Sequence, residues 1–268
     1  MTTHDDPRIE HHLASTYDAK FYDGLAGDVR SSAEVVVPIV VDLVQPLSVV
    51  DVGCGRGTWL DVFRGHGVGD VVGVDGPHIA PEDLEIPLEA FVRHDLREPL
   101  DLGRRFDLAT SLEVAEHLPA EMAEQFVGEL VAHAPAVLFS AAVPRQGGKG
   151  HVNERWPSYW SGLFEELGFV PIDVVRPAVW RDARVAFWYA QNVVLYVDPR
   201  QLPQVVTRAS APVGTPLDLV HPALHLRERD STERRRDPPS LSRVLRDLPG
   251  AAARAMRTRA GRAGGRSK

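Results

Sequence analysis

The densest group of reactive side chains in the sequence is the stretch EVAEH, residues 113–117. Glu113, Glu116 and His117 place two carboxylates and an imidazole next to one another along the chain. Such side chains can bind a divalent metal ion, supply a catalytic base, or form the polar start of a helix. Which of these applies depends on the elements that position the motif.

Apolar, β-branched runs alternate with amphipathic segments along most of the chain. Buried strands are predicted for residues 47–52, 70–75, 90–96, 105–114 and 136–144, and helices for 58–67, 119–134 and 153–168. Strands that alternate with helices form parallel sheets covered on both faces. Two further candidate strands, 169–176 and 185–197, are joined without a helix and should pair antiparallel. The sequence thus predicts an α/β, doubly wound sheet of seven strands with a C-terminal antiparallel hairpin.

The chain of 268 residues is long enough for one sizeable domain with extensions. We expect an N-terminal helical lid at residues 1–30, the main domain at 31–200, and an extension with a basic, flexible tail at 201–268. A helical pattern covers residues 8–45 in two parts, and Ser31 or Ser32 can cap the second helix.

Charge is divided unevenly along the chain. Residues 225–268 hold 13 Arg and Lys against 5 Asp and Glu, which leaves 17 against 32 in residues 1–224. Because phosphate binding needs clustered basic side chains, the acidic body argues against nucleic acid as a partner. The single cysteine gives no disulfide, the first residues lack a signal-peptide pattern, and the most apolar stretch is too short to span a bilayer. We therefore expect a cytoplasmic, soluble protein.

The stretch DVGCGRG, residues 51–57, places Asp51 before three alternating glycines at a strand-to-helix turn. Such glycines let the backbone approach a ligand closely, and the following helix offers free N–H groups. Asp75 ends the next strand, where a carboxylate can accept hydrogen bonds from ribose hydroxyls. Asp95 follows the third strand, placed for an adenine amino group. Nicotinamide-binding folds use a similar turn, and each feature alone also fits a tight turn or a helix cap.

Together these motifs resemble those of the class I S-adenosylmethionine-dependent methyltransferases, which have a Rossmann-like fold. The resemblance covers about residues 30–197. It includes HDL at 94–96, FDLATSLEV as the fourth-strand motif, and the closing hairpin, which dehydrogenases lack. It implies that S-adenosyl-L-methionine is the cofactor. The residues implied to bind it are Asp51, Gly53, Cys54, Gly55, Asp75, Gly76, Asp95, Leu96 and Leu112. By its type alone, Cys54 is expected to be a small packing residue.

The EVAEH motif follows the fourth strand, at the sheet edge that faces the transferable methyl group in this family. It also resembles the ExxEH motif of ubiquinone-pathway O-methyltransferases and small-RNA 3′-terminal 2′-O-methyltransferases, in which the two Glu and the His bind a divalent metal. The RNA enzymes add a histidine from beyond the fifth strand, and His151 matches it here. The implied ligands are therefore Glu113, Glu116, His117 and His151. Such a set suits Mn, Fe, Co or Zn, and Mg less well.

Three roles stay open for this motif. A metal ion could hold two neighbouring substrate hydroxyls and lower the pKa of the attacking one. Without a metal, His117 or His151 could act as the general base, and these two with Glu113 are the candidate catalytic residues. The motif could also be scaffolding, with both glutamates at the start of a helix that begins near Leu118.

The segments HVNE and WYAQNVVLYV are similar to those of a bacterial methyltransferase group from glycan and natural-product pathways. That similarity implies O-methylation of a hydroxyl on a sugar or other small-molecule natural product. Two alternatives are a metal-independent C- or N-methyltransferase of a small metabolite and an RNA 2′-O-methyltransferase. A non-catalytic binding partner ranks last, because such a protein is expected to lose the intact glycine turn.

Overall fold

The computed structural model describes residues 19–209 and 218–227. The chain divides into two units between His221 and Pro222, and the first contains the sheet and every residue of the predicted sites. Within the described ranges, no helix is long and apolar enough to cross a membrane. Residues 1–18 of the predicted lid lie outside these ranges, and residues 19–30 are part of helix α2, Ala19–Val44.

The predicted seven-stranded α/β sheet is confirmed. Its strands are β1 (Ser48–Val52), β2 (Asp70–Asp75), β3 (Phe91–Arg93), β4 (Leu108–Leu112), β5 (Ala136–Ser140), β6 (Val170–Ile172) and β7 (Val194–Val197). They lie in the order β3-β2-β1-β4-β5-β7-β6. The first five strands pair in parallel, whereas β7 pairs antiparallel with both β5 and β6. The carboxyl ends of β1 to β5 therefore share one edge.

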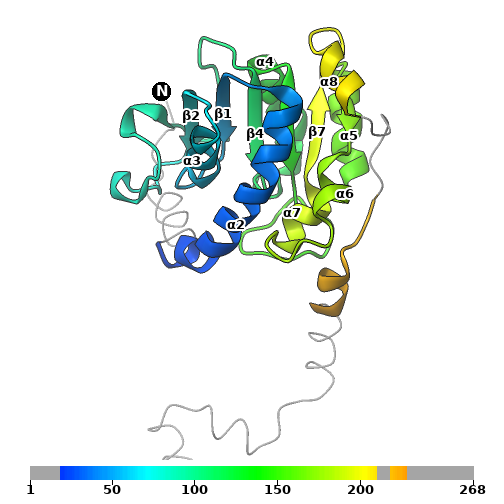
Figure 1. The fold of residues 1–268 in the computed structure, drawn as a ribbon. Helices are drawn as coiled ribbons and strands as arrows, with labels where there is room; N and C mark the ends of the chain where they lie inside the picture. The colour runs from blue at the N-terminus through cyan, green and yellow to red at the C-terminus, as the bar shows by residue number, and fades with distance from the viewer. Residues whose placement is uncertain (1–18, 210–217, 228–268) are drawn as a thin grey trace, which may run out of the picture. The chain divides into compact units, whose positions relative to one another are not determined.

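Helices cover both faces of this sheet (Figure 1). Successive strand residues point to opposite faces, so Val49 packs into one core cluster and Val50 into the other. The first face is covered by α2, α3 (Thr58–Gly65), α6 (Val175–Val179), α7 (Phe187–Asn192) and α8 (Pro203–Arg208). The second face is covered by α4 (Ala123–His133) and α5 (Pro157–Glu166). The predicted layers are thus present.

The predicted helix cap at Ser31 or Ser32 is wrong, because α2 runs through both residues without a break. Ser32 is fully buried; its hydroxyl donates to the Asp28 carbonyl and accepts the Ala186 backbone N–H. The Ser31 hydroxyl donates to the Arg184 carbonyl at 2.8 Å. These serines therefore tie α2 to the segment before α7, a long-range role that local sequence does not indicate.

The predicted connection within the C-terminal hairpin is also wrong. Residues 169–176 and 185–197 were expected to be strands joined without a helix, but α6 and α7 lie between β6 and β7. The antiparallel pairing itself is confirmed. The apolar run before β7 forms helix α7. In this helix Tyr189 and Ala190 pack into the core beside α2 and α3 and cover apolar side chains that an extended chain would leave exposed.

The glutamates of EVAEH do not lie at the start of a helix. Residues Ala115–His117 and Ala120–Met122 form short 3₁₀ turns, and α4 begins only at Ala123. The predicted helix start near Leu118 is therefore wrong, and a helix dipole does not explain the two carboxylates.

A glycine pair tests the packing behind the cofactor turn. A Cβ on Gly73 in β2 would lie 2.7 Å from Cys54 Sγ and 2.9 Å from Ile86 Cδ1, whereas a Cβ on Gly128 in α4 meets nothing within 4 Å. We expect Gly73→Ala to lower the free energy of unfolding by about 1–3 kcal/mol through overpacking. Gly128→Ala should raise it by about 0.5–1 kcal/mol. Urea denaturation of both variants measures this, and equal effects would contradict the packing described.

Candidate active site

The glycine turn after β1 is pressed against the EVAEH motif. Gly53 has φ 84, and a Cβ added there would lie 2.4 Å from Val114 Cγ2. The backbone N–H groups of Gly53 and Cys54 both donate to the Val74 carbonyl, at 2.8 and 3.1 Å. Only glycine fits this backbone and this close approach. The predicted cofactor turn and the predicted catalytic motif are therefore neighbours.

Asp75 closes this turn from the end of β2. Its Oδ2 accepts the Gly55 N–H and its Oδ1 accepts the Gly76 N–H, both at 2.6 Å. Burial raises the pKa of Asp75, while nearby His78 and these two N–H groups lower it. Each carboxylate oxygen has a second lone pair, so Asp75 can hold the turn and still accept a ligand hydroxyl.

Asp51 is a buried carboxyl on β1. Its Oδ1 accepts the Thr110 hydroxyl at 2.6 Å, and the residue is 2% exposed. Burial raises its pKa to about 7, against a lowering by Thr110 and a further rise from Asp75. An acidic group in such a place favours a cationic ligand, because a nearby positive charge stabilises its ionised form.

The remaining predicted cofactor residues lie along the same edge. Asp95 and Leu96 follow β3, and Leu112 ends β4. Asp95 forms an ion pair with Arg97, which lowers the pKa of Asp95. Cys54 is buried, and burial raises its thiol pKa well above the usual range, as expected of a packing residue.

Glu113 occupies a strained position directly after β4. Its φ is 58, and its N–H donates to both the carbonyl and the hydroxyl of Ser140, each at 3.0 Å. Its carboxylate accepts Gln146 Nε2 at 2.6 Å and Asn192 Nδ2 at 3.0 Å. Gln146 and Asn192 are 7% and 3% exposed. Both oxygens of Glu113 are therefore held by buried amides.

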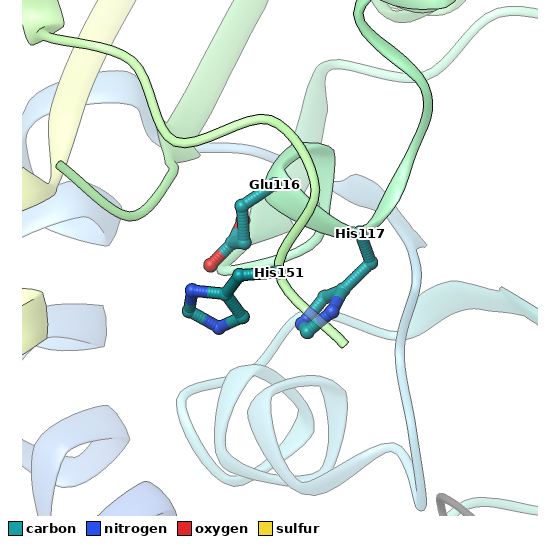
Figure 2. Close-up of side chains that lie close together, drawn as sticks. All are labelled: Glu116, His117 and His151. Atoms are coloured by element: carbon teal, nitrogen blue, oxygen red, sulfur yellow. The ribbon is translucent and has the colours of Figure 1, made fainter. Parts of the chain in front are cut away.

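Glu116, His117 and His151 come together at this edge. One ligand atom from each lies within 4.8 Å of the others. Figure 2 shows Glu116 and His117 on the turn after β4 and His151 on the loop that passes beside it. The two imidazole rings stand edge to face, with centroids 4.8 Å apart. Of the four predicted metal ligands, Glu113 is absent from this cluster.

The loop that carries His151 is anchored to Glu116 itself. The backbone N–H groups of Val152 and Asn153 donate to the Glu116 carbonyl at 2.8 and 3.0 Å, and the Arg155 N–H donates to the Ala142 carbonyl. These bonds set His151 beside His117, although they are far apart in sequence. The proximity of the two histidines, expected from the family resemblance, is thus present in the structure.

The carboxylate of Glu116 is fully buried, and within the described part of the chain neither of its oxygens has a hydrogen-bond partner. Burial raises its pKa well above the usual range and neighbouring Glu113 raises it further, whereas the nearby backbone of Glu116 and Ala142 acts to lower it. Burial and His151 lower the pKa of His117 to about 4, so this imidazole is neutral near pH 7. A buried carboxylate needs a partner, and neutral imidazoles bind metals. These residues fit a divalent cation.

Sequence reasoning missed the amides around Glu113. Gln191 is fully buried and its Nε2 donates to Gln146 Oε1 at 3.3 Å and to Asn192 Oδ1 at 3.0 Å. Its own Oε1 accepts the His221 N–H at 2.7 Å. The available signal was the polar pair Gln191–Asn192 inside the apolar run 185–197, since buried polar side chains need partners.

Comparisons with known proteins agree with this architecture. A family model described as a methyltransferase domain matches residues 30–173, more than half of the chain. No curated protein matches.

Two solved structures show the same fold. Magnesium protoporphyrin IX methyltransferase from Synechocystis with bound S-adenosylmethionine is 18% identical, with 74% of this chain and 99% of that chain covered and a TM-score of 0.50. DesVI from Streptomyces venezuelae is 18% identical, with 69% and 97% covered and a TM-score of 0.51. The family match, the sheet order and the glycine turn agree. The chain therefore belongs to the class I S-adenosylmethionine-dependent methyltransferases.

Proposed function

We propose that this methyltransferase methylates a hydroxyl of a sugar or another small-molecule natural product, and that a divalent metal ion held by Glu116, His117 and His151 assists the reaction. The observation that supports this proposal most directly is the fully buried Glu116 carboxylate, which lies beside two imidazoles and has no hydrogen-bond partner in good geometry among the described residues. Without a cation, burial raises the pKa of this carboxyl so that it keeps its proton, and a divalent metal ion would take the place of that proton.

The donor set defines the class of metal. One carboxylate and two imidazoles suit Mn, Fe, Co or Zn better than Mg, which prefers oxygen ligands. When bound, such an ion supplies Lewis acidity that lowers the pKa of a coordinated hydroxyl. We leave Glu113 out of the ligand set, because both its oxygens accept amide hydrogens and it is absent from the cluster.

The cofactor side of the site is formed by the adjoining turn. S-adenosylmethionine, when bound, supplies an electrophilic methyl group. The turn around Gly53 would lie against it, with Asp51 near its cationic portion and Asp75 near the ribose. Val114 packs against Gly53, so the turn and the EVAEH motif keep a fixed spacing. Methyl transfer depends largely on such positioning of donor and acceptor.

The alternatives are less well supported. An RNA acceptor would need a basic surface, but residues 1–224 hold 17 Arg and Lys against 32 Asp and Glu. In a metal-free reaction at a small-molecule hydroxyl, amine or carbon, His117 would be a weak base, because its pKa is lowered to about 4. His151 would then be the base. The metal proposal explains the unpartnered Glu116, which a lone base does not.

Metal content tests the proposed ligands. We expect near-stoichiometric Mn, Fe, Co or Zn in the purified protein by elemental analysis with S-adenosylmethionine present, and its loss in His117→Ala/His151→Ala. We also expect added Mn, Co or Zn to raise the melting temperature of chelator-treated wild type, because a ligand that binds only the folded state stabilises it. Glu116→Gln should remove that rise.

The matched control is His133→Ala, a buried histidine of α4 that lies outside the cluster. It should lower stability but keep the metal. If wild-type protein contains no metal and takes up none when Mn, Co or Zn is resupplied, the ligand proposal is wrong.

The raised pKa of Asp51 predicts pH-dependent cofactor binding. Below about pH 7 the folded protein keeps a proton on this carboxyl, which a cationic ligand must displace. We expect S-adenosylmethionine affinity, measured by calorimetry, to rise about tenfold from pH 5.5 to 7. Asp51→Asn should bind more weakly and lose this dependence, whereas Glu124→Gln on exposed α4 surface should keep it. A flat wild-type profile would contradict this role.

The acceptor class is tested with sugars that carry vicinal hydroxyls. We expect methylation of such glycosides, detected as a mass increase of one methyl group, and a rate at least about tenfold lower for matched deoxy analogues that lack the neighbouring hydroxyl. Chelator should remove the difference together with the activity. Equal turnover of both acceptors would indicate that no metal holds a pair of hydroxyls.

A further inference from the structure

Glu154 lies three residues after His151 and gathers the loop around its carboxylate. Its Oε1 accepts from His151 Nδ1 at 2.9 Å and from the Gly147 N–H at 2.8 Å, and its Oε2 accepts the Arg145 N–H at 2.7 Å. Arg145 has φ 72 and Gly147 has φ 69. Two backbone residues around this carboxylate are therefore left-handed. Such conformations are uncommon, and they indicate that the loop has a specific structure here.

We propose that Glu154 is a positioning residue that fixes the orientation and the tautomer of His151. This inference rests on the proposed function, in which His151 binds the metal ion together with Glu116 and His117. A carboxylate oxygen accepts the hydrogen bond in this contact, so the hydrogen between the two groups resides on His151 Nδ1. The lone pair is then on Nε2, the nitrogen left to bind a metal or take a proton. Carboxylate partners of this kind commonly orient histidines at metal sites and in catalytic pairs.

His117 gives independent support, because it is oriented in a comparable way. Its ring forms a hydrogen bond with the Gly150 backbone, which acts to raise its pKa. A histidine that binds metal usually directs its second nitrogen to a carboxylate or a backbone carbonyl. The same loop therefore provides a hydrogen-bond partner for each imidazole. Gly150 is the partner of His117, and Glu154 is the partner of His151.

Gly148 limits the position of the His151 ring from another side. A Cβ on Gly148 would lie 2.0 Å from His151 Nε2, so no other residue type fits there while the ring stays in place. The ring is bonded to Glu154 at Nδ1, and a side chain at residue 148 would block its Nε2. Its side chain is only 12% exposed, which agrees with one fixed orientation.

The experiment compares Glu154→Ala, Glu154→Gln and the control Glu166→Ala, an exposed glutamate on α5. Histidine-labelled full-length protein without metal is studied by ¹⁵N NMR near pH 8, with His151→Ala assigning the signal, and Co²⁺ affinity is measured by absorption. We expect hydrogen on Nδ1 in wild type, a mixture of tautomers in Glu154→Ala, and a fall in Co²⁺ affinity of about 10–100-fold.

The Gln variant separates positioning from folding. Its amide oxygen can still accept from His151 and Gly147, but its NH₂ group faces the Arg145 N–H, so partial retention of the Nδ1 tautomer and of Co²⁺ affinity is expected. Circular dichroism checks that all variants fold. Hydrogen on Nε2 in wild type, or an unchanged tautomer and affinity in folded Glu154→Ala, would overturn the proposal. If wild type binds no Co²⁺, the proposed metal fails, while the tautomer comparison still decides the role of Glu154.

Discussion

The arrangement of the candidate site depends on Glu116, through its backbone carbonyl and through its carboxylate. Its backbone carbonyl accepts the N–H groups of Val152 and Asn153, which brings the loop of His151 down beside His117. Its carboxylate is fully buried and accepts no hydrogen bond from the described residues. The same docking that assembles the imidazoles also desolvates the carboxylate. The proposed cation would replace the proton that burial keeps on this carboxyl, and its binding would then be coupled to folding through Glu116.

The two neighbouring glutamates are stabilised by different means. Glu113 receives hydrogen bonds from Gln146 and Asn192, buried amides that can satisfy a carboxylate without a counter-charge. Among the described residues, no side-chain amide donates to Glu116. Two adjacent carboxylates repel when both are ionised, so at least one needs a strong partner. The amides around Glu113 therefore leave Glu116 as the natural place for a cation.

Local sequence was sufficient for the strands β1, β2, β4 and β5, because each is a short apolar run and the glycines after β1 require a turn. It failed where long-range packing decides. The run before β7 looks like a strand but is helical over Phe187–Asn192, because its apolar side chains fill the space beside α2 and α3. Glu154 carried no signal of its own, since its role depends on a loop whose shape the sequence does not indicate.

The loop between β5 and α5 has a fixed part and an open part, and this division bears on the acceptor. Backbone bonds fix it at Gln146, at Val152 with Asn153, and at Arg155. Residues 147–150 between these anchors are exposed. Gly147 and Gly150 have positive φ and bond to Glu154 and His117, and His151 excludes a side chain at Gly148, so these contacts constrain substitution least at Lys149. If the proposed acceptor binds at this loop, most of the loop is fixed by the contacts that hold the two histidines, and little of it is left to vary with the acceptor.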